Sequence, residues 1–268
     1  MRPGMIALSL AGLDRSPDRS WAGGLRRAVA WAASIGYRAV TLDATQPGIR
    51  ARELDRSARR DLAATLRRLE LDLAGLDLWI PASHFADPEK ADRAVAAAVG
   101  AIELTADLST LVGDERGVVS LTLPEEPDAA LVALLRARAD ACGVQVADHT
   151  WVAKSEDRLG ADRSPDEPLG VGIDPPTVLI AGGDPAAAAA SLGRGLKSAR
   201  LANLASGGRA PLHAADGKLD ELGYLVSLST SGYERYLVVD VRGLGDQAGA
   251  ASDAARRLLP HTPAPSTG

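Results

Sequence analysis

The sequence predicts a single α/β domain, a closed (β/α)8 barrel. Short apolar runs alternate with helical patterns from end to end, and eight such units fit within 268 residues. Strict alternation implies a parallel sheet, because parallel strands need crossover helices between them. No glycine-rich phosphate-binding fingerprint follows the first apolar run, which counts against an open dinucleotide-binding sheet. We therefore expect one barrel over residues 1–260.

Eight apolar runs are expected to form the strands of the barrel. The first of them is interrupted soon afterwards by Asp14 and Arg15, so it is expected to be a strand and not a signal peptide. The run Leu71–Leu78 alternates in the manner of a strand. The predicted strands are Met5–Leu10, Ala39–Asp43, Leu71–Leu78, Gly117–Leu123, Val144–Asp148, Leu169–Asp174, Ser198–Leu201 and Tyr236–Val241.

The segments between these runs show helical spacing, with Gly36 and Gly143 placed where helices commonly end. The predicted helices are Ala22–Ile35, Arg56–Glu70, Asp87–Asp107, Asp128–Ala141, Asp184–Leu192, Leu219–Ser231 and Gln247–Leu259. Three segments are expected to lack regular structure. They are the polar loop Ser155–Pro168, the glycine-containing loop Ala205–Gly217 and a disordered C-terminal tail, His261–Gly268.

Composition excludes several classes of function. Net charge is −5 and aromatic residues make up 3%, which argues against nucleic-acid binding by phosphate tracking or base stacking. The single cysteine, Cys142, excludes an internal disulfide framework and is expected to be a small buried residue at a helix end. No apolar run approaches the ~20 residues that span a bilayer. We expect a cytoplasmic protein without a membrane partner, whose core consists of Ala, Leu and Val, with Leu and Val filling the barrel layers.

Several phrases in order along the chain resemble the xylose-isomerase-like family of sugar-phosphate isomerases and epimerases, which are TIM barrels. The phrase at residues 34–44, SIGYRAVTLDA, resembles the junction of the family's first helix and second strand. Phrases in the second half are similar to the family's fifth to eighth strands and to the turn before its seventh helix. They are Gly143–His149, Gly172–Pro175, Lys197–Asn203, Gly217–Asp220 and Gly232–Asp240.

The resemblance implies a small-molecule carbohydrate substrate and one divalent cation, Mn²⁺, Mg²⁺ or Co²⁺. In this chemistry the ion polarises a substrate oxygen, and carboxylates on the fifth and eighth strands move a proton on and off carbon. The corresponding catalytic residues are Asp148 and Asp240. The implied metal ligands are Asp148, His149, Asp174 and Asp240, and the candidate substrate-binding residues are Asp43, His84, Arg200 and Arg209.

This sequence departs from the family pattern at the expected metal ligands. Thr177 and Arg200 stand where the resemblance implies histidines. Asp148 or His149, depending on register, replaces the fifth-strand glutamate, and Asp240 replaces the eighth. A guanidinium does not ligate metal. We therefore expect a degenerate metal site, in which Arg200 takes the place of the ion and pairs with Asp174 or Asp240.

Each candidate residue also has a structural interpretation. Carboxylates at strand ends, such as Asp148 and Asp174, commonly cap the following helix or loop. Asp240 and Arg242 would form a simple surface pair, and His149 a neutral, hydrogen-bonded histidine. His84 would cap a loop, while Arg209 and His213 would be solvated loop residues.

Three functions compete. The first is a sugar or sugar-phosphate isomerase or epimerase that transfers a proton alpha to a carbonyl, with reduced or no metal dependence. The second is a catalytically inactive barrel that binds a carbohydrate or serves as an assembly subunit. The third is an endonuclease with a three-zinc site, which four histidines, including His261 in the tail, and one cysteine do not supply. The oligomeric state stays open.

Overall fold

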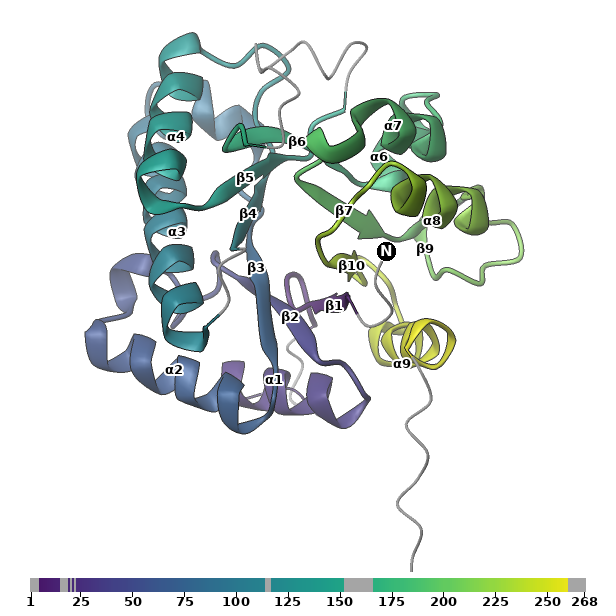
Figure 1. The fold of residues 1–268 in the computed structure, drawn as a ribbon, viewed down its shortest axis with the longest axis horizontal. Helices are drawn as coiled ribbons and strands as arrows, with labels where there is room; N and C mark the ends of the chain where they lie inside the picture. The colour runs from purple at the N-terminus through teal and green to yellow at the C-terminus, as the bar shows by residue number, and fades with distance from the viewer. Residues whose placement is uncertain are drawn as a thin grey trace, which may run out of the picture.

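The computed structural model describes residues 5–14, 19, 21, 23–113, 117–151 and 166–259. Eight parallel strands close into a barrel in the order β1-β10-β7-β6-β5-β4-β3-β2, with helices around it (Figure 1). All eight predicted strands are present and the predicted barrel is confirmed. The barrel strands are β1 (Ile6–Ser9), β2 (Ala39–Asp43), β3 (Asp72–Leu78), β4 (Val118–Leu121), β5 (Gln145–Asp148), β6 (Leu169–Ile173), β7 (Ser198–Leu201) and β10 (Leu237–Val239).

The helices follow the predicted order, with local differences at their ends. They are α1 (Leu25–Ser34), α2 (Arg56–Arg68), α3 (Ala91–Val112), α4 (Ala129–Cys142), α6 (Pro175–Ile180), α7 (Pro185–Leu192), α8 (Glu221–Thr230) and α9 (Gln247–Leu258). Asp128 and Asp184 cap α4 and α7 by accepting hydrogen bonds from backbone amides. Gly143 ends α4 in the left-handed conformation, as predicted. Cys142 lies at that helix end and is half-buried.

A short helix and a two-stranded hairpin appear where the sequence predicted no regular structure. The short helix α6 follows β6 directly, with two prolines at its first positions, where they need not donate backbone hydrogen bonds. The loop predicted over Ala205–Gly217 instead begins in an antiparallel hairpin of β8 (Asn203–Ala205) and β9 (Gly208–Ala210). Most of the segment Ser155–Pro168 and the whole tail His261–Gly268 lie outside the described residues.

Helix α3 begins four residues later and ends five residues later than predicted. It has 22 residues, and an 18-residue window of it reaches a mean hydropathy of 1.5, enough by length and composition alone to cross a membrane. The expectation that no segment approaches this length is therefore corrected. In the barrel α3 packs against α2, α4 and strands β3 and β4, and its buried face includes Ala98, Ile102 and Leu108. This is the position of an outer barrel helix.

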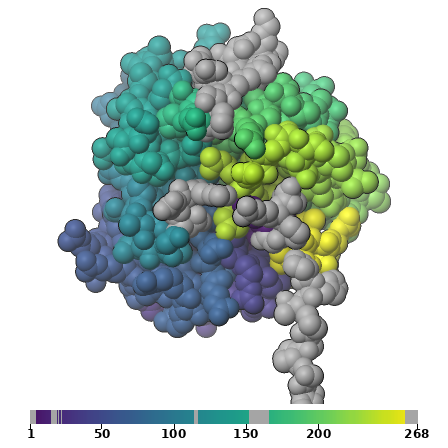
Figure 2. Space-filling view, in the orientation of Figure 1, coloured from purple at the N-terminus to yellow at the C-terminus, as the bar shows by residue number. Residues whose placement is uncertain are grey.

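The interior of the barrel differs from the expected layers of Leu and Val. Those residues pack mainly in the large core that includes the buried faces of the surrounding helices. The strand faces that point into the lumen carry mostly small or polar side chains, and their apolar residues include the small cluster Ala7, Ala39, Ala74 and Val238. Space inside the barrel is therefore left for a few long polar side chains. Most residues before 152 lie on the left and lower centre of Figure 2, and most residues after 165 lie on its right.

Candidate functional site

The carboxyl ends of the strands bring charged residues together at one mouth of the barrel, the face that carries the active site in barrels of this kind. Asp174 follows β6, and Asp240 follows β10. Both are almost completely buried, at 5% and 2% exposure, so their charges require partners. Two arginines from different segments, Arg209 and Arg242, provide these partners.

A buried ion pair crosses the lumen between β7 and β3. The guanidinium of Arg200 donates two hydrogen bonds to Asp77, one of them 3.1 Å from Nη1 to Oδ2, and both residues are fully buried. Because β3 and β7 are not neighbours in the barrel, this contact passes through its interior. Ser9 and Thr41 also donate to Asp77 Oδ2, at 2.6 and 3.0 Å. Four strands are thereby joined at one carboxylate.

This pairing corrects the expected role of Arg200. We predicted that it pairs with Asp174 or Asp240, whereas it pairs with Asp77, which the sequence analysis did not select. Asp77 lies inside the predicted strand Leu71–Leu78, and the signal that could have revealed it was an acidic residue among buried apolar neighbours. Such a residue needs a partner of opposite charge. Which partner it finds depends on barrel closure.

Asp174 and Asp240 are instead held by Arg209 and Arg242. Arg209, on the β8–β9 hairpin, lies 2.7 Å from Asp174 Oδ2 through Nη1 and 3.1 Å from Asp240 Oδ2 through Nη2. Arg242 donates through Nε and Nη2 to Asp240 Oδ2, at 2.9 and 2.6 Å. Thr177 donates to Asp174 Oδ2 at 3.0 Å. The predicted surface pair of Asp240 and Arg242 is therefore part of a larger network. We call these four residues, Asp174, Asp240, Arg209 and Arg242, the mouth network.

The mouth network is held in place by Trp79, which directly follows β3. The guanidinium carbon of Arg242 lies 3.8 Å from the centre of the Trp79 ring, and that of Arg200 lies 5.1 Å from it. Gly12, whose φ is +67°, leaves room for Arg242, since a Cβ there would lie 2.8 Å from Arg242 Cγ. Two guanidiniums are thus packed on one indole.

His149 occupies the inward position at the end of β5. It is 2% exposed, its ring meets Trp79 edge-on at 5.4 Å between centroids, and no residue that the structure describes is a hydrogen-bond partner of either ring nitrogen. Burial, and then the charges of Arg200 and Arg242, hold the pKa of His149 well below its usual range. The imidazole is therefore neutral at neutral pH. The predicted hydrogen bond of a neutral histidine is absent among the described residues.

The register of β5 decides between Asp148 and His149. Successive side chains along a strand point to opposite faces, and His149 faces the lumen beside Gly172. Asp148 lies on the opposite face with Val146, where its Oδ1 accepts hydrogen bonds from the backbone amides of Leu123 and Thr150, at 3.0 and 3.1 Å. Asp148 thus has the loop-capping role, and the structure does not bring it into the mouth network.

The other candidate residues serve local structure. Asp43 ends β2 and accepts hydrogen bonds from the amide and hydroxyl of Thr45. His84 lies half-buried in a short 3₁₀ helix, Ala82–Phe85, after β3. His213 lies 3.6 Å from Asp253 of α9 and is about half exposed. No contact described for these three residues joins them to the mouth network.

Electrostatics explain how Asp240 tolerates burial. Burial alone would raise its pKa, but the guanidiniums of Arg242 and Arg209 outweigh this and hold the pKa of Asp240 well below its usual range. Asp240 therefore stays ionised and is a weak base. A carboxylate that accepts a proton in catalysis works best with a pKa near the working pH.

The residues present do not fit the divalent ion that the fold family implies. Among the described residues no three His, Cys, Asp or Glu side chains group as metal ligands. The chemistry of the donors agrees with this, because Asp174 and Asp240 share Arg209 and because Arg242 binds Asp240 through two nitrogens. A divalent ion between them would face fixed positive charges.

Two glycines of β6 make room for large side chains inside the barrel. Gly170 and Gly172 share the inward face of the strand, where a Cβ at Gly170 would lie 2.9 Å from Lys197 Cε. At Gly172 a Cβ would lie 2.5 Å from His149 Nε2. The interior of β6 is therefore shaped to seat Lys197 and His149.

Replacing Gly172 by alanine is expected to lower the free energy of unfolding by about 1–3 kcal/mol, because the new methyl group overlaps the His149 ring. In a urea-unfolding double-mutant cycle, His149→Ala should recover most of this loss by removing the ring. Equal effects of Gly172→Ala with and without His149 would contradict the packing described here. The matched control is Gly207→Ala, because a Cβ there would meet no neighbouring atom. Gly48→Ala is unsuitable because the φ of Gly48 is positive, which strains any other residue.

This chain is similar to known proteins in its three-dimensional structure and not in its sequence. No protein-family model and no curated protein sequence matches the chain. A xylose isomerase domain protein from Planctomyces limnophilus is 17% identical with a TM-score of 0.62, over 94% of this chain and 93% of that one. A sugar phosphate isomerase/epimerase from Parabacteroides distasonis is 14% identical with a TM-score of 0.62, over 96% of both chains.

A third solved structure, a probable 3-DHS dehydratase involved in petrobactin synthesis from Bacillus anthracis, is 12% identical with a TM-score of 0.66. That match covers 94% of this chain and 98% of that one. The three proteins have different activities in their descriptions, and at these identities the likeness concerns the path of the chain. Together with the closed eight-stranded barrel, it establishes that this chain has the xylose-isomerase-like (β/α)8 barrel fold.

Proposed function

We propose that the protein is a sugar-isomerase-like barrel that binds a small carbohydrate at its mouth without a divalent ion, in the cytoplasm. This is the inactive, carbohydrate-binding alternative of the sequence analysis. It takes precedence over the isomerase because the likeness to sugar isomerases supports a sugar ligand, whereas the mouth network does not support metal-assisted proton transfer.

The observation that carries the proposal is a set of buried polar atoms without partners at the mouth. Trp79 Nε1, both ring nitrogens of His149 and Asp174 Oδ1 have no hydrogen-bond partner among the described residues. Such atoms are rare in folded proteins and call for a ligand or water. Trp79 contributes a donor, Asp174 an acceptor, and neutral His149 one of each. A ligand with several hydroxyl groups, each both donor and acceptor, matches this set.

The same residues argue against isomerase turnover. Proton transfer at carbon requires a base, and the pKa of Asp240 is held well below its usual range, which leaves that carboxylate weakly basic. His149 is neutral, but its own lowered pKa makes it a weak base too. Arg209 and Arg242 are permanently charged and cannot accept a proton. The residues at the mouth are therefore poorly suited to proton transfer at carbon.

Calorimetric titration tests the proposal with a panel of neutral sugars, sugar acids and sugar phosphates, each with EDTA and with Mn²⁺. We expect at least one compound to bind equally under both conditions. Trp79→Phe keeps the aromatic ring but removes the indole donor, so it should weaken binding about five- to tenfold, the value of one hydrogen bond. Trp31→Phe, on α1, is the matched control. Binding that requires Mn²⁺, or no binding at all, would contradict the proposal.

A second function, metal-independent epimerisation, is favoured by one observation: the unpartnered Asp174 Oδ1 lies at the same mouth as an unprotonated histidine. It predicts exchange of the proton next to the ligand's carbonyl in D₂O, which NMR detects. No exchange in the presence of EDTA with a compound that binds supports the non-catalytic barrel. Exchange that is lost in Asp174→Asn would establish the epimerase.

A further inference from the structure

Two neighbouring helices on the outer wall of the barrel, α7 and α8, are almost free of charged residues. The sequence of α7 is PAAAAASL, and Glu221 is the only charged residue of α8. In α2, by contrast, Arg and Asp make up six of the 13 residues. A helix on the outside of a globular protein normally carries charged residues on its solvent side. The composition of α7 and α8 therefore indicates a surface that another molecule covers.

The outer side of these helices also exposes large apolar side chains. Of the four such side chains that are exposed in the described part of the chain, Leu222 and Val226 lie on α8, at 72% and 50% exposure, and Ile180 ends α6, which contacts α7. Leu222 and Val226 are four positions apart and therefore share one side of the helix. Helices α7 and α8 contact each other and lie side by side on the right of Figure 1. We call the exposed residues Ala187, Ala190, Leu222, Val226 and Thr230 the α7–α8 face.

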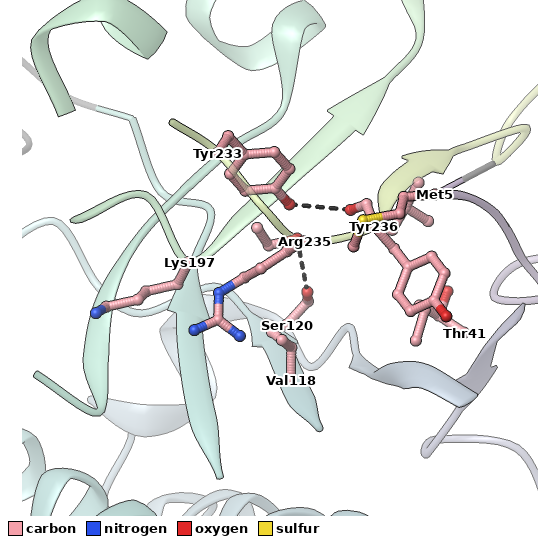
Figure 3. A pocket seen from close by; sticks show the side chains of 11 residues that line it. Met5, Thr41, Val118, Ser120, Lys197, Tyr233, Arg235 and Tyr236 are labelled. Carbon is pink, nitrogen blue, oxygen red and sulfur yellow. Dashed lines mark hydrogen bonds between the residues drawn. The ribbon is translucent and has the colours of Figure 1, made fainter. Parts of the chain in front are cut away.

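Helix α8 cannot turn its exposed side chains inward, because its other side is already packed. Tyr224 and Leu228 are completely buried in the core. Directly after the helix, the hydroxyl of Tyr233 accepts a hydrogen bond from the amide of Ala199 on β7 and donates one to the carbonyl of Tyr236, both at 2.9 Å. Figure 3 shows Tyr233 directed toward Tyr236. The α7–α8 face is therefore held in a fixed position on the barrel.

The α7–α8 face combines a ridge with a hollow. Helix α8 presents Leu222 and Val226, whereas the exposed positions of α7 carry only alanine and serine. The two helices run in the same direction, because each leads back to the next parallel strand. A twofold axis perpendicular to the face, between the two helices, would place α8 of one copy over α7 of a second copy. Large side chains would then pack against small ones, and the face is complementary to itself.

Electrostatics also favour a second copy of this chain as the partner. Like charges that meet across a twofold axis repel each other, and none of the five residues of the α7–α8 face is charged. The twofold arrangement places the helices of the two copies antiparallel, so the partial positive charge at each helix start approaches the partial negative charge at a helix end. A strongly charged partner, such as an acidic peptide, would find no opposite charge on this face.

We propose that the α7–α8 face is the interface of a homodimer, in which α8 of each copy packs on α7 of the other. The interface lies on the side wall of the barrel, so it leaves both mouths open and does not depend on the proposed function. Sedimentation velocity over a dilution series should show a monomer–dimer equilibrium, with a dimer mass twice the 27.7 kDa of one chain. A wild-type chain that stays monomeric at about 100 μM would leave the face to a different protein and overturn the proposal.

Val226→Glu should raise the Kd of the dimer more than about 100-fold, because the new carboxylate would be buried in the interface without a partner. Leu134→Glu is the matched control, since Leu134 is the exposed large apolar residue of α4, outside the α7–α8 face, and this variant should keep the wild-type Kd. Circular dichroism and the Tm establish that both variants fold. A dimer that persists in Val226→Glu would place the interface elsewhere and contradict the proposal.

Ala190→Leu separates packing of a ridge into a hollow from general apolar adhesion. The leucine adds apolar surface, so general adhesion would lower the Kd of the dimer. In the proposed interface it fills the hollow that Leu222 and Val226 of the other copy occupy, and overpacking should raise the Kd about tenfold or more. A Kd that falls or stays unchanged in Ala190→Leu would refute the packing of α8 on α7.

Discussion

Replacing Arg200 by methionine is expected to lower the free energy of unfolding by about 3–5 kcal/mol, measured by urea unfolding. The substitution leaves the fully buried carboxyl group of Asp77 without its guanidinium partner, and only the hydroxyls of Ser9 and Thr41 still donate to it. Burying an unpaired charge is among the most costly changes in a protein interior. Asp77→Leu alone should destabilise by a similar amount, because it leaves the Arg200 guanidinium unpaired.

The double variant distinguishes a pair from two independent residues. Arg200→Met combined with Asp77→Leu should be clearly less destabilised than the sum of the single variants, because no charge remains buried. Arg26→Gln is the matched control, since Arg26 and Asp61 form an exposed surface pair. Exposed ion pairs of this kind contribute about 0–1 kcal/mol to the free energy of unfolding. Additive effects of the two lumen substitutions would show that the pair is not energetically coupled.

Replacing Arg242 by glutamine is expected to lower the free energy of unfolding by about 2–3 kcal/mol at pH 7, because charged hydrogen bonds to buried Asp240 are lost. In the wild type the pKa of Asp240 is lower in the folded than in the unfolded state. The stability from this pair is therefore present above the unfolded pKa and is lost as the pH falls through the folded pKa. In Arg242→Gln the folded-state pKa of Asp240 should be higher than in the wild type. The difference in free energy of unfolding between the variant and the wild type should therefore shrink as the pH falls from 7 to 4.

His149 also makes the difference in stability between Arg242→Gln and the wild type shrink as the pH falls. Its folded pKa lies below that of the unfolded chain, so the folded state loses stability as the pH falls below about 6.5. Removing the nearby charge of Arg242 should reduce this loss in the variant. Urea unfolding between pH 7 and pH 4 measures both effects, with Arg257→Gln at the exposed Glu221 pair as control. A deficit that grows on acidification would contradict the electrostatic account of the mouth network.

These experiments concern residues that differ in how well the sequence predicted them. Asp174 and Asp240 follow strands whose apolar runs are visible in the sequence, and parallel strands necessarily bring their carboxyl ends to one mouth. Arg242 lies two residues beyond Asp240, so that pair could be predicted from proximity alone. Arg209 was predicted as a mouth residue, but its two carboxylate partners depend on the β8–β9 hairpin, which the sequence analysis interpreted as an irregular loop.

The sequence by itself determined the barrel, because alternating strand and helix patterns act locally and closure follows from eight parallel units. It also predicted carboxylates at the strand ends of the mouth, and it shows Thr177 and Arg200 where the resemblance implies histidines. Only the tertiary structure decided that Arg200 pairs with Asp77 across the lumen, since the two residues lie 123 positions apart in the sequence. It also decided that His149 faces the interior while Asp148 faces away. The physical reason is that a buried charge takes whichever partner barrel closure brings within hydrogen-bond distance, and that a shift of one residue in a strand reverses the face of every side chain.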